Sequence, residues 1–126
     1  MTEPAAVPRL HVCITCRAGR TLGDGEVPPG ARLHDAIAQR PGAAEAVRLA
    51  AVACLANCER GCSAAISAAG KWTYLLGGLG PEDAADLLAY ARTYAASASG
   101  TVMPSRRPPA LRQAVIGRIP APELLA

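Results

Sequence analysis

The sequence predicts an α/β fold built on a small mixed sheet, and three patterns lead to that prediction. Alternating apolar residues near the N-terminus have the period of a strand. A glycine-centred apolar hairpin follows the middle of the chain. Two segments carry apolar residues at helical spacing. The expected elements are, in chain order, a strand at 10–15, a helix at 28–41, a strand at 46–53, strands at 64–67 and 72–76, and a helix at 81–100.

The first half of the chain gives a strand, a loop and a helix. Leu10, Val12 and Ile14 alternate with polar or small residues, so Cys13 faces away from the apolar row at the end of the strand. The stretch 17–30 contains four glycines and two prolines and is expected to be a loop. Pro28 and Pro29 then open a short helix that ends near Pro41 and whose apolar side is formed by Leu33, Ala36 and Ile37.

The second half gives three strands and a longer helix. The run AVRLAAVA at 46–53 suits a buried strand that leads into Cys54. Gly70 supplies the turn between strands 64–67 and 72–76, since glycine adopts positive φ at little cost. Pro81 is a favourable first residue for the last helix. That helix has an apolar stripe formed by Ala84, Leu87, Leu88, Ala91 and Ala95.

The element order β-α-β-β-β-α limits the topology. Because the chain starts with a strand, a helix and a second strand, the two strands are expected to be parallel and joined by a right-handed crossover. The hairpin that follows adds antiparallel strands. We therefore expect a thioredoxin-like α/β sandwich over residues 10–100. A flexible N-terminus, 1–9, precedes it, and a Pro/Arg-rich extension, 101–126, follows as an irregular tail that drapes over the domain or reaches a partner.

Composition and charge exclude several classes of function. The formal net charge of +3 lies in residues 101–126, where four arginines stand against Glu123, and the preceding hundred residues are neutral. Four arginines and few aromatic residues argue against nucleic acid binding. No apolar run approaches the length of a membrane span, and the N-terminus lacks the apolar segment of a signal peptide. We expect a cytoplasmic protein, in which thiols stay reduced and five cysteines indicate a metal or catalytic site.

The cysteines form two clusters, VCITC and CLANCERGC. Cys13 and Cys16 are separated by two residues, and Cys54 and Cys58 by three. Two such pairs satisfy tetrahedral zinc and equally a 2Fe–2S cluster, in which each iron takes two thiolates. Their spacing alone leaves both open. The 37 residues between the pairs exceed the roughly 15 to 20 of zinc ribbons, which favours iron–sulfur.

A dithiol redox site is the third reading of Cys13 and Cys16. Such chemistry needs the first cysteine at a helix N-terminus, where the dipole lowers its pKa. Here the pair runs into the glycine and proline-rich loop 17–30, which makes this reading less favourable.

These residues resemble a known family. VCITC, then CLANC followed by Glu59, Arg60 and Gly61, then a hairpin with Tyr74, resembles the thioredoxin-like 2Fe–2S ferredoxins. CLANCERGC with GKWTYLLGGL and the late RRPPALRQAVIGRIP is similar to a branch of small bacterial proteins classed as predicted metal-binding. The resemblance covers residues 10–120. It implies a cluster held by four cysteines and a role as an electron carrier; those ligands are Cys13, Cys16, Cys54 and Cys58.

The sequence therefore predicts a small 2Fe–2S electron carrier without enzymatic turnover of its own. Cys62 stands where the ferredoxins usually have proline and is a candidate fifth ligand. A zinc carrier that uses the same thiolates and a dithiol oxidoreductase remain the alternatives. The expected partners are a protein redox partner and a second copy of the chain in a homodimer. The tail arginines are candidates for docking an acidic redox partner.

Overall fold

The computed structural model describes residues 7–17, 21–57 and 61–121, so Cys58 and Arg60 lie outside the described residues. Its principal elements are β1 (Arg9–Cys13), α1 (Pro29–Ala38), α2 (Ala43–Ala46), β2 (Arg48–Val52), β3 (Cys62–Ser67), β4 (Thr73–Leu79), α3 (Ala84–Ala96) and β5 (Val115–Ile119). Three short 3-10 turns, η2 (Pro81–Asp83), η3 (Pro104–Arg106) and η4 (Pro109–Leu111), lie in the second half. The predicted order β-α-β-β-β-α is confirmed, with β5 added after it.

The strands form one five-stranded sheet in the order β2-β1-β3-β4-β5. β1 and β2 are parallel, and every other neighbouring pair is antiparallel. The parallel pair is joined through α1, as the strand, helix, strand start predicts. The β3–β4 hairpin turns at Gly70, where φ is +72°. β4 continues beyond residue 76, where the strand was expected to end, as far as Leu79.

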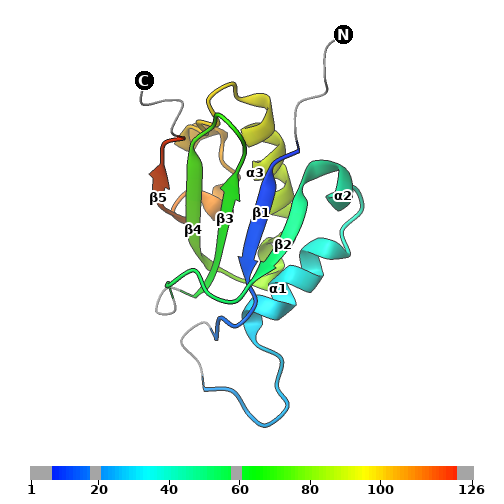
Figure 1. Ribbon diagram of the computed structural model, residues 1–126. Coiled ribbons are helices and arrows are strands. Elements are labelled where there is room, and N and C mark those ends of the chain that lie inside the picture. The colour runs from blue at the N-terminus through cyan, green and yellow to red at the C-terminus, as the bar shows by residue number, and fades with distance from the viewer. Residues whose placement is uncertain (1–6, 18–20, 58–60, 122–126) are drawn as a thin grey trace.

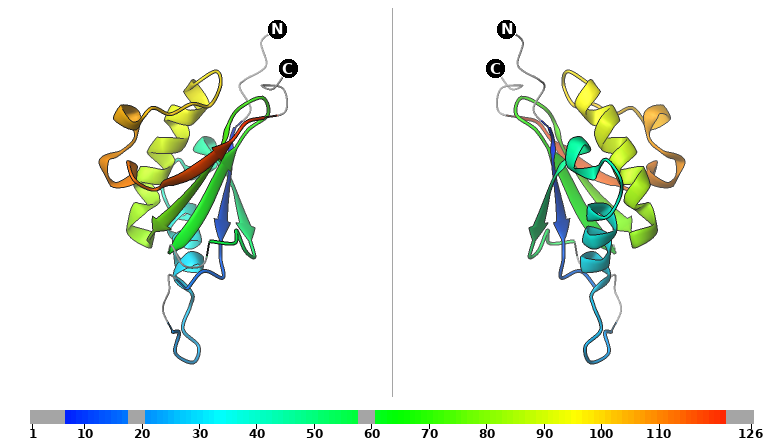
Figure 2. Two further views of the ribbon diagram at one scale, coloured as in Figure 1. Left: turned by 90° about the vertical axis from the view of Figure 1, so that its left-hand side faces the viewer. Right: turned by 90° about the vertical axis from the view of Figure 1, so that its right-hand side faces the viewer.

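The sheet and the helices form two layers. Figure 2 shows α1 and α3 on one side of the sheet, and Figure 1 shows that β1 begins and β5 ends at the opposite end of the sheet from the long loop before α1. The core lies between the layers and combines Leu10 and Val12 of β1 with Leu33 and Ile37 of α1 and Leu87 of α3. The apolar stripes predicted from the sequence therefore face this interior.

Tyrosines supply the aromatic core in a chain without phenylalanine. The Tyr74 ring stands edge-on to Tyr90 at 6.0 Å and to Tyr94 at 6.4 Å between ring centroids. Tyr94 donates its hydroxyl hydrogen to the Trp72 carbonyl at 2.6 Å. Lys71, which follows the turn at Gly70, donates from Nζ to the Ala95 carbonyl at 2.8 Å and so caps the C-terminal end of α3.

The C-terminal extension differs from the irregular tail that was predicted. Val115–Ile119 forms β5, which pairs with β4. Val102, Leu111 and Ala114 are buried in the same core as the sheet. β5 gives hydrogen-bonding partners to the backbone groups of β4 that would otherwise lie at an open edge. The abundance of proline and arginine conceals this strand in the sequence.

None of the helices within the described residues is long and apolar enough to cross a membrane.

Replacing Leu111 by Ala is expected to lower the free energy of unfolding by about 2–5 kcal/mol, because Leu111 is fully buried. The matched control is Ile119→Ala in β5, where the side chain is 66% exposed and the loss should stay below about 0.5 kcal/mol. Urea unfolding followed by circular dichroism measures both. Equal stability of the two variants would mean that the extension is not part of the folded core.

Candidate functional site

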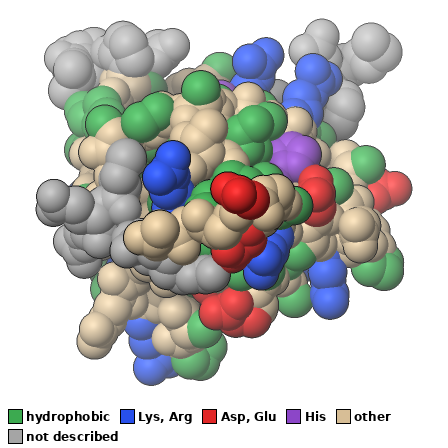
Figure 3. All heavy atoms as spheres, turned by 90° about the horizontal axis from the view of Figure 1, so that it is seen from below, with side chains coloured by type: hydrophobic (Ala, Val, Ile, Leu, Met, Phe, Trp, Pro, Cys, Tyr) green, Lys and Arg blue, Asp and Glu red, His purple; other side chains and the backbone are tan. Residues whose placement is uncertain are grey.

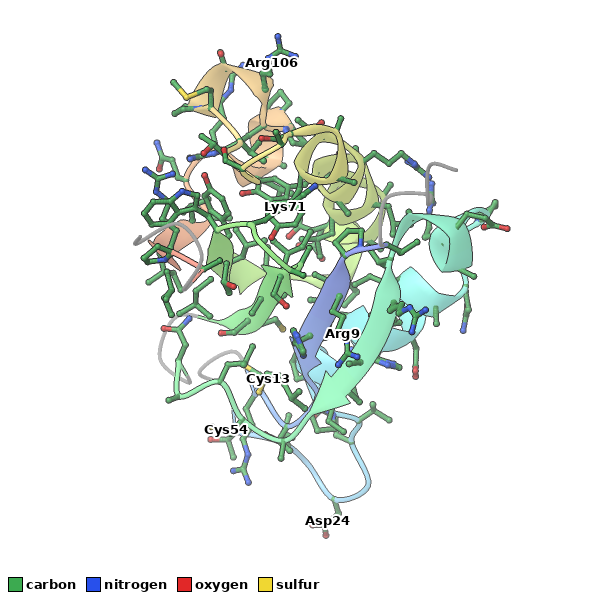
Figure 4. All side chains as sticks on the ribbon, turned by 45° about the horizontal axis from the view of Figure 1, so that its top comes forward. Arg9, Cys13, Asp24, Cys54, Lys71 and Arg106 are labelled. Atoms are coloured by element: carbon green, nitrogen blue, oxygen red, sulfur yellow. The ribbon has the colours of Figure 1, made fainter. Side chains whose placement is uncertain are left out.

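Three cysteine-bearing segments meet at one end of the sheet. β1 and β2 are parallel and in register, with Cys13 opposite Val52, so the segments that follow both strands leave at the same end. β3 runs antiparallel to β1 and begins at that end with Cys62. Figure 4 shows Cys13 and Cys54 at this end, far from Arg106. The sheet thus brings together residues that lie about forty positions apart in the sequence.

Cys13 is the last residue of β1, and its side chain contacts the segment that leads to Cys54. Its side chain is buried, with the sulfur 3.8 Å from the Ala53 carbonyl oxygen and 3.7 Å from the Thr15 hydroxyl. The Thr15 hydroxyl also donates to the Ala53 carbonyl. Cys13 stays out of the main apolar core, as the strand alternation predicts, and is covered by these end segments instead.

Cys16 points toward the start of β3. Its thiol donates to the Gly61 carbonyl oxygen at 2.9 Å, and the residue is 3% exposed. The Cys16 carbonyl in turn accepts a hydrogen bond from the Gly30 amide at 3.0 Å. The two thiols of the first pair therefore reach toward different strands.

Gly30, in the first turn of α1, allows the helix to pack directly on the Cys13–Cys16 turn. A Cβ at this position would lie 2.0 Å from the Cys13 carbonyl oxygen, so only glycine fits without a backbone shift. No helix N-terminus was expected near this pair from the sequence, because a loop follows it in the chain. In the structure α1 begins after that loop and packs back against the Cys13–Cys16 turn. The positive end of the helix dipole consequently faces the thiols.

Cys62 is the most deeply buried thiol of the group, with no exposed surface. Desolvation by burial, followed by the nearby Cys16, raises the pKa of Cys62 to about 11. Because burial disfavours the thiolate, Cys62 is protonated at neutral pH. The Cys16 sulfur lies against the backbone that directly precedes Cys62, at the Gly61 carbonyl oxygen.

Cys54 is exposed, unlike the other three described cysteines. Its sulfur accepts a hydrogen bond from the Ala56 amide at 3.2 Å, and Ala56 adopts a left-handed φ of 58°. Asn57 donates to the Ser63 hydroxyl at 2.9 Å and so ties this loop to β3. These hydrogen bonds hold the loop in a turn in which the Ala56 N–H points to the Cys54 sulfur.

The structure brings only part of the predicted ligand set together. Cys13, Cys16 and Cys62 are buried at one sheet end, and Cys54 lies on its rim. Over residues 7–17, 21–57 and 61–121, no three His, Cys, Asp or Glu side chains are close enough to hold a metal ion. Cys58, the fourth predicted ligand, lies outside this part of the chain. Cys13 and Cys16 are buried thiols, and the sulfur of Cys54 accepts an N–H hydrogen bond. Sulfur ligands of this kind fit an iron–sulfur group or zinc.

The surface around this end carries charges of both signs. Figure 3, seen from the cysteine end, shows acidic and basic side chains next to one another among apolar ones. Arg17 is exposed beside Cys16. Two of the tail arginines lie elsewhere, since Arg106 is at the opposite end in Figure 4 and Arg118 stacks on Trp72 with its guanidinium carbon 4.0 Å from the ring centroid.

Sequence reasoning missed two residues that shape the site. Gly30 falls where the expected loop 17–30 and the expected helix 28–41 overlap, and no role was predicted for it. The signal was its place directly after Pro28 and Pro29, which mark a helix start. Asn57 was read only as a loop residue within CLANC. Its amide contact with Ser63 depends on how β3 follows the loop, and the local sequence holds no signal for it.

The fold is similar to that of a solved protein. The structure of a thioredoxin-like [2Fe-2S] ferredoxin from Aquifex aeolicus matches with a TM-score of 0.57 and 14% identity, over 92% of this chain and 96% of that one. At this identity the likeness shows the fold, and it confirms the predicted thioredoxin-like architecture. No curated protein matches the chain.

A family pattern covers nearly the whole chain. The family described as "Protein of unknown function (DUF1636)" matches residues 10–121, from the first strand to just beyond β5. The protein belongs to this family.

Proposed function

We propose that the protein is a small electron carrier that holds a 2Fe–2S cluster through Cys13, Cys16, Cys54 and Cys58. The observation that carries the proposal is the in-register parallel pairing of β1 with β2, which sets the Cys13 sulfur 3.8 Å from the carbonyl oxygen of Ala53, the residue before Cys54. The segments that lead into Cys16 and Cys54 therefore leave the sheet side by side. The 2Fe–2S ferredoxin of similar fold supports the choice of group.

The three proposed ligands that the structure describes divide between a buried and an exposed side. Cys13 and Cys16 are almost inaccessible to solvent, whereas Cys54 is exposed on the rim. Cys58 completes the second pair and lies outside the described residues. A bound cluster would supply one-electron transfer, and the exposed side would give it the shorter route to another protein.

The chain stabilises negative charge at this position in two ways. The Ala56 amide donates to the Cys54 sulfur at 3.2 Å. The N-terminal end of α1 abuts the Cys13–Cys16 turn through Gly30 and adds a positive partial charge. Hydrogen bonds to sulfur and nearby positive charge favour the more negative, reduced state and so raise a cluster's reduction potential.

Cys62 is placed outside the ligand set. Its thiol is fully buried, and burial raises its pKa to about 11, which disfavours its ionisation to a ligand thiolate. The role proposed for it is a hydrogen-bonding neighbour of Cys16.

The partner proposed for the cluster is a cytoplasmic redox protein that docks on the cysteine end. Charges of both signs on this end (Figure 3) favour a partner with a complementary mixed surface. Arg106 is not part of this contact surface, because it lies at the far end. Two further expectations stay predictions. One is that the chain forms a homodimer, and the other is that it belongs to the branch of bacterial proteins classed as predicted metal-binding.

Metal analysis of anaerobically purified protein separates the iron–sulfur carrier from the zinc carrier. We expect a brown protein with about two iron and two acid-labile sulfide per chain, as a 2Fe–2S cluster requires. Visible absorption and elemental analysis measure this. A colourless protein with one zinc per chain would replace the proposal by the zinc alternative.

The Cys54→Ser variant is expected to lose its cluster, because one iron would lack a thiolate. The matched control is Cys62→Ser, which should keep iron, sulfide and visible absorption. Iron and sulfide content per chain is the readout. If Cys62→Ser loses the cluster and Cys54→Ser retains it, the four ligands have been assigned wrongly. The dithiol alternative instead expects Cys54→Ser to leave thiol–disulfide activity intact without any bound metal.

Gly30→Ala is expected to lower cluster retention, because its Cβ would displace α1 from the Cys13 carbonyl. The control is Gly23→Ala in the loop that precedes α1, where the nearest atom to the new Cβ is a Glu26 carboxylate oxygen at 3.7 Å. The half-life of visible absorption in the presence of an iron chelator measures retention. Equal half-lives would show that the helix contact does not support the cluster.

A further inference from the structure

Cys16 and Cys62 form a thiol pair that links the turn after β1 to the start of β3. The Cys16 thiol donates to the Gly61 carbonyl oxygen at 2.9 Å, and Gly61 directly precedes Cys62. Beyond burial, Cys16 also raises the pKa of Cys62, as a neighbouring thiol does. They are 46 residues apart in the sequence, so the fold alone creates the pair.

The other described cysteines point elsewhere. The Cys13 sulfur lies near Thr15 and the Ala53 carbonyl, at the end of β2. Cys54 is exposed and its sulfur is bound by the Ala56 amide. Although Cys13 and Cys16 are close in sequence, their thiols reach toward different strands, and Cys62 is the thiol that meets Cys16.

We propose that Cys16 and Cys62 form a reversible disulfide in the cluster-free protein, which withdraws Cys16 from the ligand set and blocks cluster loading until it is reduced. The blocking effect rests on the proposed function, because it requires Cys16 to be a ligand. The disulfide itself does not depend on that function.

The oxidant is a low-molecular-mass disulfide of the glutathione class. The Cys16 thiolate attacks one sulfur of the oxidant, forms a mixed disulfide and releases one small thiol. The Cys62 thiolate then attacks the Cys16 sulfur, forms the intramolecular bond and releases the second small thiol. The protein loses two protons and two electrons, and the oxidant gains them as two thiols.

Burial makes this reaction slow. Cys16 is 3% exposed and Cys62 is fully buried. The raised pKa of Cys62 keeps its thiolate fraction small at neutral pH. The test is therefore an equilibrium measurement after long incubation. Exposed Cys54 provides an internal standard for thiols that react quickly.

The experiment uses the full chain after reduction and removal of metal with a chelator. It is equilibrated in glutathione buffers of rising oxidised fraction, quenched with acid and alkylated. Trypsin then separates the cysteines usefully, since Cys13 and Cys16 fall in peptide 10–17, Cys54 and Cys58 in 49–60, and Cys62 in 61–71. Mass spectrometry identifies the linked peptides, and fragmentation between Cys13 and Cys16 shows which one is alkylated.

The expected product joins peptide 10–17 to peptide 61–71 through Cys16, with Cys13 alkylated. It is expected to disappear on return to reduced glutathione. An internal Cys13–Cys16 bond as the main product, or glutathione adducts alone, would overturn the inference.

Variants and loading assays connect the linkage to the cluster. Cys62→Ser and the smaller Cys62→Ala are expected to abolish the cross-link, whereas Cys54→Ser is expected to keep it. After oxidation, the wild-type chain is expected to take up several-fold less iron and sulfide than Cys62→Ala, and a dithiol reductant should remove the difference. Failure of the cross-link with normal loading overturns the inference and leaves the proposed function standing. Formation of the cross-link with unchanged loading contradicts the blocking step and Cys16 as a ligand.

Discussion

The parallel pairing of β1 with β2 is the constraint on which the cysteine end depends. In-register pairing of Arg9–Cys13 with Arg48–Val52 makes both strands end at the same level. A parallel pair needs a crossover, and α1 provides it on the face where its apolar residues meet Leu10 and Val12. A shift of one residue would turn Cys13 to the other face of the sheet and separate it from Ala53.

The α1 crossover also sets the environment of the thiols. Because Gly30 lacks a side chain, the first turn of the helix reaches the Cys13–Cys16 turn and donates to the Cys16 carbonyl. The same packing leaves Cys13 and Cys16 buried while Cys54 stays exposed. The site is therefore asymmetric: its thiols are buried on the side that faces the fold and exposed on the side that faces solvent. This asymmetry suits a carrier that must hold its group and still pass electrons outward.

Local patterns predicted the elements of the fold well, and long-range contacts were the part that sequence could not show. Leu10 and Val12 alternate as a strand requires, and the Pro81 start predicted α3. β5 was not predicted, because it pairs with the backbone N–H and C=O groups at the edge of β4, and that edge exists only once the sheet has formed. The cysteine pairs were found from their spacing. That Cys16 meets Cys62 rather than Cys13 depends on where β3 begins, which spacing does not encode.

The central claim is that thiols from two strand ends share one iron–sulfur group. X-ray absorption at the iron edge of the anaerobically purified native chain tests it most directly, because it reports the atoms bound to the metal. The account predicts iron surrounded only by sulfur, with a second iron as the nearest metal neighbour. Iron bound by nitrogen or oxygen, or a chain that carries zinc without iron, would contradict it.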